Sequence, residues 1–135
     1  MVHLTRKEHF NAAHRLYNPK WSDGENETVF GKCANKHFHG HNYNLYVTVK
    51  GEPDADTGLI VNLKELSIII KSKVIDQLDH KNLNLEVDLL RGKIPSTENL
   101  AIAIWNELKP HIKGCTLHSI KLFETENNFA EYFGE

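Results

Sequence analysis

A strict alternation of side chains over residues 39–51, HGHNYNLYVTVKG, constrains the fold of this chain more than any other feature. The odd-numbered positions hold His39, His41, Tyr43, Leu45, Val47 and Val49. Because successive side chains of a strand point to opposite faces, this pattern predicts a half-buried strand. Its core-facing side begins with two histidines. Residues 2–14 are also predicted to be extended, with Phe10, Ala12 and His14 on one face.

Two helices are predicted in the middle of the chain. Asn62 can cap the first, with Glu65 at the capping-box spacing. Its apolar stripe consists of Leu63, Leu66, Ile70 and Val74. The second helix is predicted to begin near Ser96, and Pro110 should end its regular part. Its apolar positions are Leu100, Ile104, Trp105, Leu108 and Ile112.

The remaining segments complete the predicted order of elements. TLHSIKLFET and FAEYFG, separated by a turn at residues 126–128, are typical of a hairpin. Residues 17–38 are interpreted as a long loop, and residues 59–61 as a return to extended chain. The order strand, strand, helix, helix, strand, strand indicates an α+β fold, with both helices on one face of a four-stranded antiparallel sheet. A length of 135 residues suits a single domain over residues 1–135.

Composition excludes several classes of function. The net charge of −2 at pH 7 gives no sequence-wide basicity for nucleic acid. The most apolar stretch, residues 66–70, is too short to span a membrane, and the charged start MVHLTRKEHF does not suit a signal peptide. Two cysteines make no disulfide framework. We therefore expect a reduced cytoplasmic protein that binds neither nucleic acid nor membrane.

Three histidines are candidate metal ligands. His39 and His41 lie on one strand face, and His14 ends the neighbouring strand. Three histidines that leave a fourth position open are typical of catalytic Zn²⁺ sites. An HxH pair can also simply cover a strand end, and HFHGH allows His37 with His39 as a different pair. We prefer His39 and His41, which leaves His37 exposed or behind the ligands.

Cys33 is the candidate reactive thiol. It lies in a polar segment with Lys32, Lys36 and His37, and positive neighbours favour the thiolate form. Cys115, at the entry to a strand, is interpreted as an inert cysteine.

Two acidic positions complete the candidate site. Asp79 and His80 follow the first helix, whose negative end favours a protonated imidazole, although such a pair is also common in solvated loops. Glu124 is predicted to share a face with His118, Ile120 and Leu122. An inward carboxylate needs a partner, either a protein cation or a ligand with two parallel N–H donors.

Several motifs together resemble the 6-pyruvoyltetrahydropterin synthase family over nearly the whole chain. They are FNAAHRL, FGKCANKHFHGHNY, TGLIVNLKEL, LDHKNLN, STEN, ETENN and YFGE. The resemblance implies the tunnelling fold, ββααββ, assembled through trimers into a hexamer with barrel-like sheets. It also implies active sites at subunit interfaces, which would bring Asp79 and His80 to Cys33.

The resemblance further implies roles for individual residues. Zinc ligands would be His14, His39 and His41; the catalytic residues would be Cys33, Asp79, His80 and Glu124; and the pterin would be bound by Glu124 and lined by Thr97. The implied reaction is that of a carbon–oxygen lyase, which eliminates triphosphate from 7,8-dihydroneopterin triphosphate. Candidate cations for the triphosphate, chosen by proximity in sequence, are Arg15, Lys32, Lys36 and Lys81.

Two alternatives stay open. The related 6-carboxytetrahydropterin synthases of queuosine biosynthesis act on the same substrate and often have three residues between the cysteine and the HGH pair. Here residues 34–38 intervene, and ETENN favours the pyruvoyl branch, although His37 stands where the shorter spacing would place a histidine. The other alternative is a non-catalytic, zinc-binding oligomeric scaffold, which would need neither Cys33 nor Glu124.

Overall fold

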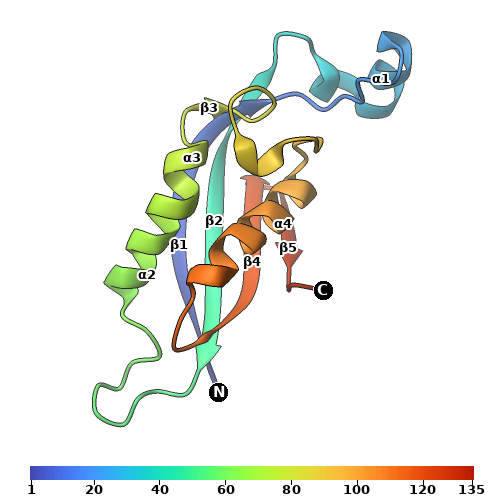
Figure 1. The fold of residues 1–135 in the computed structure, drawn as a ribbon. Coiled ribbons are helices and arrows are strands. Elements are labelled where there is room, and N and C mark those ends of the chain that lie inside the picture. Colours follow the sequence, from blue (N-terminus) through green and yellow to red (C-terminus); the bar gives the residue numbers. More distant parts are fainter.

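Strands β1 (Val2–His14) and β2 (His39–Gly51) dominate the computed structural model, which describes residues 1–135. Both strands have the predicted bounds. They pair antiparallel along their whole length, with Val2 opposite Gly51 and His14 opposite His39. The end of β1 and the start of β2 therefore lie side by side (Figure 1).

The sheet has five strands in the order β3-β1-β2-β4-β5. Strands β4 (Thr116–Thr125) and β5 (Asn128–Tyr132) form the predicted antiparallel hairpin. The prediction of a four-stranded, wholly antiparallel sheet is wrong, because β3 (Lys81–Asn82) adds a short parallel pair beside Ala12 and Ala13 of β1. A strand of two residues is too short to show a periodic pattern in the sequence.

Helix α2 (Leu63–Ile70) begins after the predicted cap Asn62, and α4 (Thr97–Leu108) begins near Ser96, as predicted. Asn62 Oδ1 accepts from the backbone N–H of Lys64, and Ser96 Oγ accepts from that of Asn99. The first helix continues through a π-helical turn (Lys71–Ile75) into α3 (Asp76–Leu78). Helix α4 ends before a 3-10 turn that contains Pro110, as predicted. None of the helices has both the length and the apolar character needed to cross a bilayer.

The interpretation of residues 17–38 as a long loop is wrong. Helix α1 (Asp23–Phe30) begins after Ser22, whose hydroxyl accepts from the backbone N–H of Glu25, and a 3-10 turn (Gly31–Ala34) follows. Helix α1 lies away from the sheet (Figure 1) and buries only Asn26. It therefore lacks the apolar stripe on which helix prediction depends. Residues 59–61 form no strand either.

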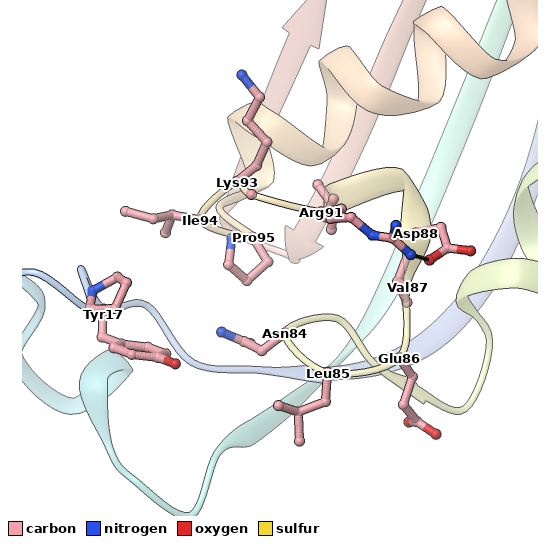
Figure 2. Close-up of a pocket in the computed structure, with 13 residues that line it drawn as sticks. Tyr17, Asn84, Leu85, Glu86, Val87, Asp88, Arg91, Lys93, Ile94 and Pro95 are labelled. Carbon is pink, nitrogen blue, oxygen red and sulfur yellow. Dashed lines mark hydrogen bonds and ion pairs between the residues drawn. The ribbon is translucent and has the colours of Figure 1, made fainter.

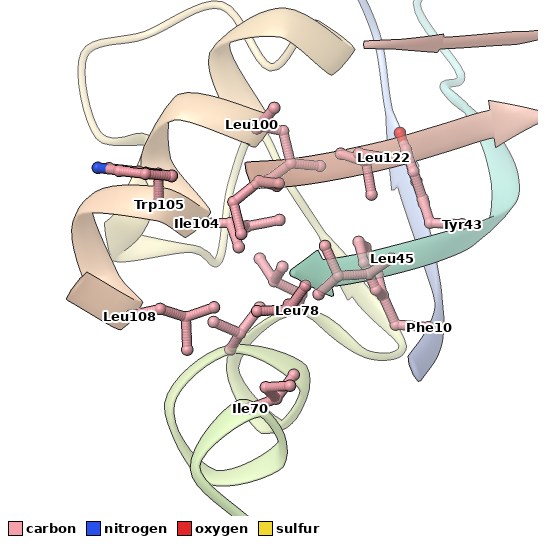
Figure 3. Close-up of a cluster of buried hydrophobic side chains, with 14 of the residues drawn as sticks. Phe10, Tyr43, Leu45, Ile70, Leu78, Leu100, Ile104, Trp105, Leu108 and Leu122 are labelled. Atoms are coloured by element: carbon pink, nitrogen blue, oxygen red, sulfur yellow. The ribbon is translucent and has the colours of Figure 1, made fainter. Parts of the chain in front are cut away.

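The core lies between the sheet and helices α2 and α4, which cover one face (Figure 1). Its buried members from these helices and from the π-helical turn after α2 include Leu66, Ile70, Val74, Leu100, Ile104, Trp105 and Leu108, whereas Leu63 is exposed. Figure 3 shows Ile70, Ile104 and Leu108 directed toward the same cluster as the β2 side chains Tyr43 and Leu45. Phe10 stacks on Tyr43 with ring centroids 4.8 Å apart. This packing holds the core face of β1 and β2 in place up to the histidines.

His118 does not lie on the core face, contrary to prediction. A bulge shifts the register, so that Thr48 pairs with Ser119 and Val49 with Leu117. His118 therefore has no pairing partner on β2, and its ring centroid lies 4.3 Å from that of His3. One extra residue in a strand reverses the alternation on one side of it, which a strictly alternating interpretation cannot anticipate.

Candidate metal centre

The three candidate histidines converge at the paired ends of β1 and β2. The ring centroid of His14 lies 4.6 Å from that of His39 and 5.1 Å from that of His41. The rings of His39 and His41 lie 4.9 Å apart. The antiparallel register brings His14 beside His39, and the two-residue spacing adds His41 on the same face.

The potential ligand atoms at this site lack hydrogen bonds. One nitrogen from each of His14, His39 and His41 and one carboxylate oxygen of Glu124 all lie within 4.8 Å of one another. Nε2 of His14, both ring nitrogens of His39 and Nε2 of His41 are buried without a hydrogen-bond partner. Leaving such atoms unpaired costs about 1–3 kcal/mol each. A divalent cation would satisfy one nitrogen of each of the three rings together, and imidazole nitrogens in this number suit Zn²⁺.

The backbone before α4 orients His14. Its Nδ1 lies 2.8 Å from the carbonyl oxygen of Pro95, to which it can donate, and its ring is fully buried beside Tyr43. With the proton on Nδ1, the lone pair of Nε2 faces the other two histidines. Figure 2 shows Pro95 at the end of the segment that begins at Asn84. This carbonyl, far away in the sequence, could not be predicted as part of the site.

Glu124, at the end of β4, points into the histidine cluster. Its Oε1 lies 2.9 Å from His41 Nε2. The two atoms do not form a hydrogen bond, because the ring nitrogen is not oriented toward the carboxylate oxygen as a donor. The other oxygen accepts a short hydrogen bond from the Thr97 hydroxyl at the start of α4. The predicted inward carboxylate therefore has a protein partner, Thr97. It also lies close enough to join the histidines as a metal ligand, a role that the sequence reasoning did not consider.

Burial keeps His14 and His39 in their metal-binding form. Burial is the largest cause that lowers the pKa of His14, and the neighbouring His39 and His41 lower it further. The Pro95 carbonyl and Glu124 raise this pKa, but the net shift is downward. Burial, followed by the charge of His41, likewise lowers the pKa of His39. Both imidazoles are therefore neutral at neutral pH, as metal coordination requires.

Metal-free protein is expected to lose stability as the pH falls below the ordinary histidine pKa of 6.5. Below that value these histidines become protonated in the unfolded chain but stay neutral in the folded protein, so acid favours unfolding. Thermal unfolding in chelator between about pH 8 and pH 5.5 would measure this loss. His39→Asn should reduce the slope, whereas His37→Asn, at an exposed position, should not. Equal slopes in all three proteins would contradict this account.

Cys33 is attached to the chain that follows His14. It lies half-buried in the 3-10 turn, and its carbonyl oxygen accepts from the backbone N–H of Leu16 at 2.7 Å. Lys36, which was expected to favour the thiolate, pairs with Asp23 at 3.0 Å. Both cysteines are free thiols. Burial raises the pKa of Cys115, in agreement with its interpretation as inert.

Asp79 and His80 are clamped to the edge of β1. Asp79 Oδ1 accepts from the backbone N–H of Asn11 at 2.9 Å, and the N–H of His80 donates to the Asn11 carbonyl at 2.7 Å. His80 Nδ1 lies 2.9 Å from Asp79 Oδ2, and its side chain is 78% exposed. The Asn11 N–H, helped by His80, lowers the pKa of Asp79. Within one chain, no hydrogen bond or ion pair joins this pair to Cys33 or to the histidine cluster.

Comparison with known proteins gives full-length matches. The family model described as 6-pyruvoyl tetrahydropterin synthase matches residues 3–135. The 6-pyruvoyl tetrahydrobiopterin synthase of Dictyostelium discoideum is 50% identical over 134 residues, 99% of this chain and 97% of the relative. The structure of Caenorhabditis elegans 6-pyruvoyl tetrahydropterin synthase superposes with a TM-score of 0.93 at 37% identity, covering 99% of this chain and 96% of that one. The 6-carboxy-5,6,7,8-tetrahydropterin synthase of Haemophilus influenzae is 28% identical over 152 residues, covering 98% of this chain and 99% of that relative.

Proposed function

This chain belongs to the 6-pyruvoyl tetrahydropterin synthase family, and we propose that it converts 7,8-dihydroneopterin triphosphate to 6-pyruvoyltetrahydropterin with release of inorganic triphosphate. The observation that carries the proposal is the set of buried, unpartnered nitrogens on His14, His39 and His41, beside the segment of Cys33. A non-catalytic scaffold would require neither the Cys33 thiol nor the inward carboxylate of Glu124.

The three histidines would hold Zn²⁺, which would polarise the hydroxyls of the substrate side chain and acidify the adjacent C–H. Cys33, as a thiolate, would accept the proton from that carbon. The C–O bond to the triphosphate then breaks, and the leaving group takes the electron pair.

Glu124 and the Asp79–His80 pair have separate roles in this proposal. Glu124, held by the Thr97 hydroxyl, would accept hydrogen bonds from the amino and ring N–H groups of the pterin. Asp79, whose pKa is lowered, stays ionised and orients the exposed ring of His80 to transfer protons. These transfers would complete the internal redox step to the pyruvoyl product.

Because no hydrogen bond or ion pair joins Asp79 and His80 to Cys33 in one chain, the proposal includes a homo-oligomer with active sites between subunits. A hexamer built from two trimers with barrel-like sheets would bring the pair against the partner subunit's Cys33. The edge strands β3 and β5 are the positions at which sheets of neighbouring subunits can pair. A cytoplasmic location belongs to the same proposal.

Similarity favours the pyruvoyl branch. Identity is 50% to the pyruvoyl relative and 28% to the carboxy relative. The five residues between Cys33 and His39, and the ETENN segment around Glu124, point the same way.

Incubation of zinc-loaded protein with 7,8-dihydroneopterin triphosphate, followed by mass identification of the pterin, tests the proposed function. We expect the 6-pyruvoyl product together with stoichiometric inorganic triphosphate. A carboxy or hydroxymethyl product would assign the chain to another branch of the chemistry. Absence of any product from protein that retains zinc would favour the scaffold.

A further inference from the structure

The structure separates the four candidate cations for the triphosphate into two places. Arg15, Lys32 and Lys36 line one pocket of about 560 Å³ between the end of β1, helix α1 and the turn that carries Cys33. Lys81 lines a different pocket, together with His80. Proximity in sequence could not distinguish them.

Arg15 is a half-buried cation without an acidic partner. Its Nη2 donates to the Ala34 carbonyl oxygen at 3.1 Å, and its guanidinium lies over the Tyr17 ring, 3.8 Å from the centroid. Its Nε is buried without any hydrogen-bond partner, and no carboxylate lies within ion-pair distance of it. A charge that is partly removed from water and left without a counterion favours the binding of an anion.

The backbone of Arg15 is held rigidly. Its N–H donates to Asn84 Oδ1 at 2.9 Å, and its carbonyl accepts from Asn84 Nδ2 at 3.0 Å. Figure 2 shows the Asn84 side chain directed toward the segment that carries Tyr17. Arg15 also directly follows His14, a candidate metal ligand. Its position relative to the histidine cluster is therefore fixed by the same strand end.

The other charges of the pocket differ in how far they are neutralised. Lys32 directly precedes Cys33 and makes no ion pair, whereas Lys36 is paired with Asp23 at 3.0 Å. Glu27 of α1 is exposed and also lines the pocket. Arg15 and Lys32 are thus the two cations that remain free for a ligand, with Glu27 as the opposing charge.

The geometry points to this pocket as a binding site for an oligophosphate, with Arg15 and Lys32 as its principal contacts. The inference rests on the proposed function, in which the group bound there is the triphosphate of the substrate and then the leaving triphosphate. Arg15 offers phosphate oxygens a planar fork of N–H donors, and Lys32 offers a point charge. The site lies beside the turn of the reactive thiol, where the leaving group departs.

The test uses zinc-loaded protein titrated calorimetrically with inorganic triphosphate at fixed ionic strength. Arg15→Gln and Lys32→Gln are each expected to weaken binding roughly tenfold or more, with unchanged zinc content. Arg15→Lys should recover only part of the loss, since it restores charge without the fork. Glu27→Gln should tighten binding about two- to fivefold, because it removes the opposing charge from an exposed position. Lys64→Gln, on the exposed first turn of α2, is the charge-matched control and should change nothing.

Two results separate this inference from the proposed function. If the wild-type protein forms the pyruvoyl product while triphosphate affinity is the same in the Arg15, Lys32 and Glu27 variants, the site is wrong and the function stands. If triphosphate binds in an Arg15-dependent manner but no pterin is produced, the site stands and the proposed function fails. Wild-type protein with no measurable affinity for inorganic triphosphate would overturn the inference directly.

Discussion

Cys33→Ala is expected to lower turnover of 7,8-dihydroneopterin triphosphate by about 10²–10⁴-fold, the range for loss of a positioned general base, while zinc content stays unchanged. The side chain of Cys33 is not among the atoms that converge on the candidate metal site, which belong to His14, His39, His41 and Glu124. Loss of activity without loss of metal would therefore separate base chemistry from metal binding. Triphosphate release and zinc per chain are the two measurements.

Cys115→Ala is the matched control for this prediction. Cys115 is also a free and half-buried thiol, but burial raises its pKa, and it packs against the core far along the chain from the histidines. It should retain wild-type turnover. Cys33→Ser should behave like Cys33→Ala, because a hydroxyl is a much weaker acid than a thiol and supplies almost no anion at neutral pH. Wild-type turnover in Cys33→Ala would remove the thiol from the mechanism.

The histidine cluster could be predicted because it depends on strand periodicity. His39 and His41 needed only the two-residue repeat, and His14 needed only the antiparallel pairing of two adjacent strands. The cap at Asn62 and the helix start near Ser96 were equally local, and both predictions are confirmed. Where a site is set by short-range regularity, its geometry follows from the order of residues.

The parts that escaped prediction depend on contacts between distant segments. The Pro95 carbonyl reaches His14 across 81 positions, and Asp79 reaches Asn11 across 68. The bulge that reverses His118 is set by the pairing of β2 with β4, not by local pattern. Helix α1 lacked an apolar stripe, so only the cap at Ser22 marked it. A periodic pattern in the sequence cannot identify hydrogen-bond partners that are 68 or 81 positions apart.

His39→Ala is expected to abolish zinc retention, beyond the roughly 10–100-fold loss of affinity that follows damage to the hydrogen-bonded partners of metal ligands. Both ring nitrogens of His39 are buried without partners, so no hydrogen bond of the protein holds the ring in place. Removing it also removes two unpaired polar atoms, which offsets the cavity left behind. Metal-free His39→Ala should therefore unfold close to the wild-type temperature, but addition of zinc should no longer raise it. Zinc per chain by elemental analysis and unfolding with and without zinc are the measurements.

Glu124→Gln shows whether the Glu124 carboxylate is a metal ligand or a substrate-binding group. Glutamine keeps the shape of the side chain and an acceptor for the Thr97 hydroxyl, but it lacks the charge. If His14, His39 and His41 suffice as ligands, this variant retains zinc and loses substrate affinity, because an amide cannot accept two parallel N–H donors. If Glu124 is itself a ligand, zinc is lost as it is in His39→Ala. We expect the first outcome, since three histidines leave a position to which the hydroxyls of the substrate can bind. Retention of zinc by His39→Ala at wild-type affinity would contradict the metal site as a whole.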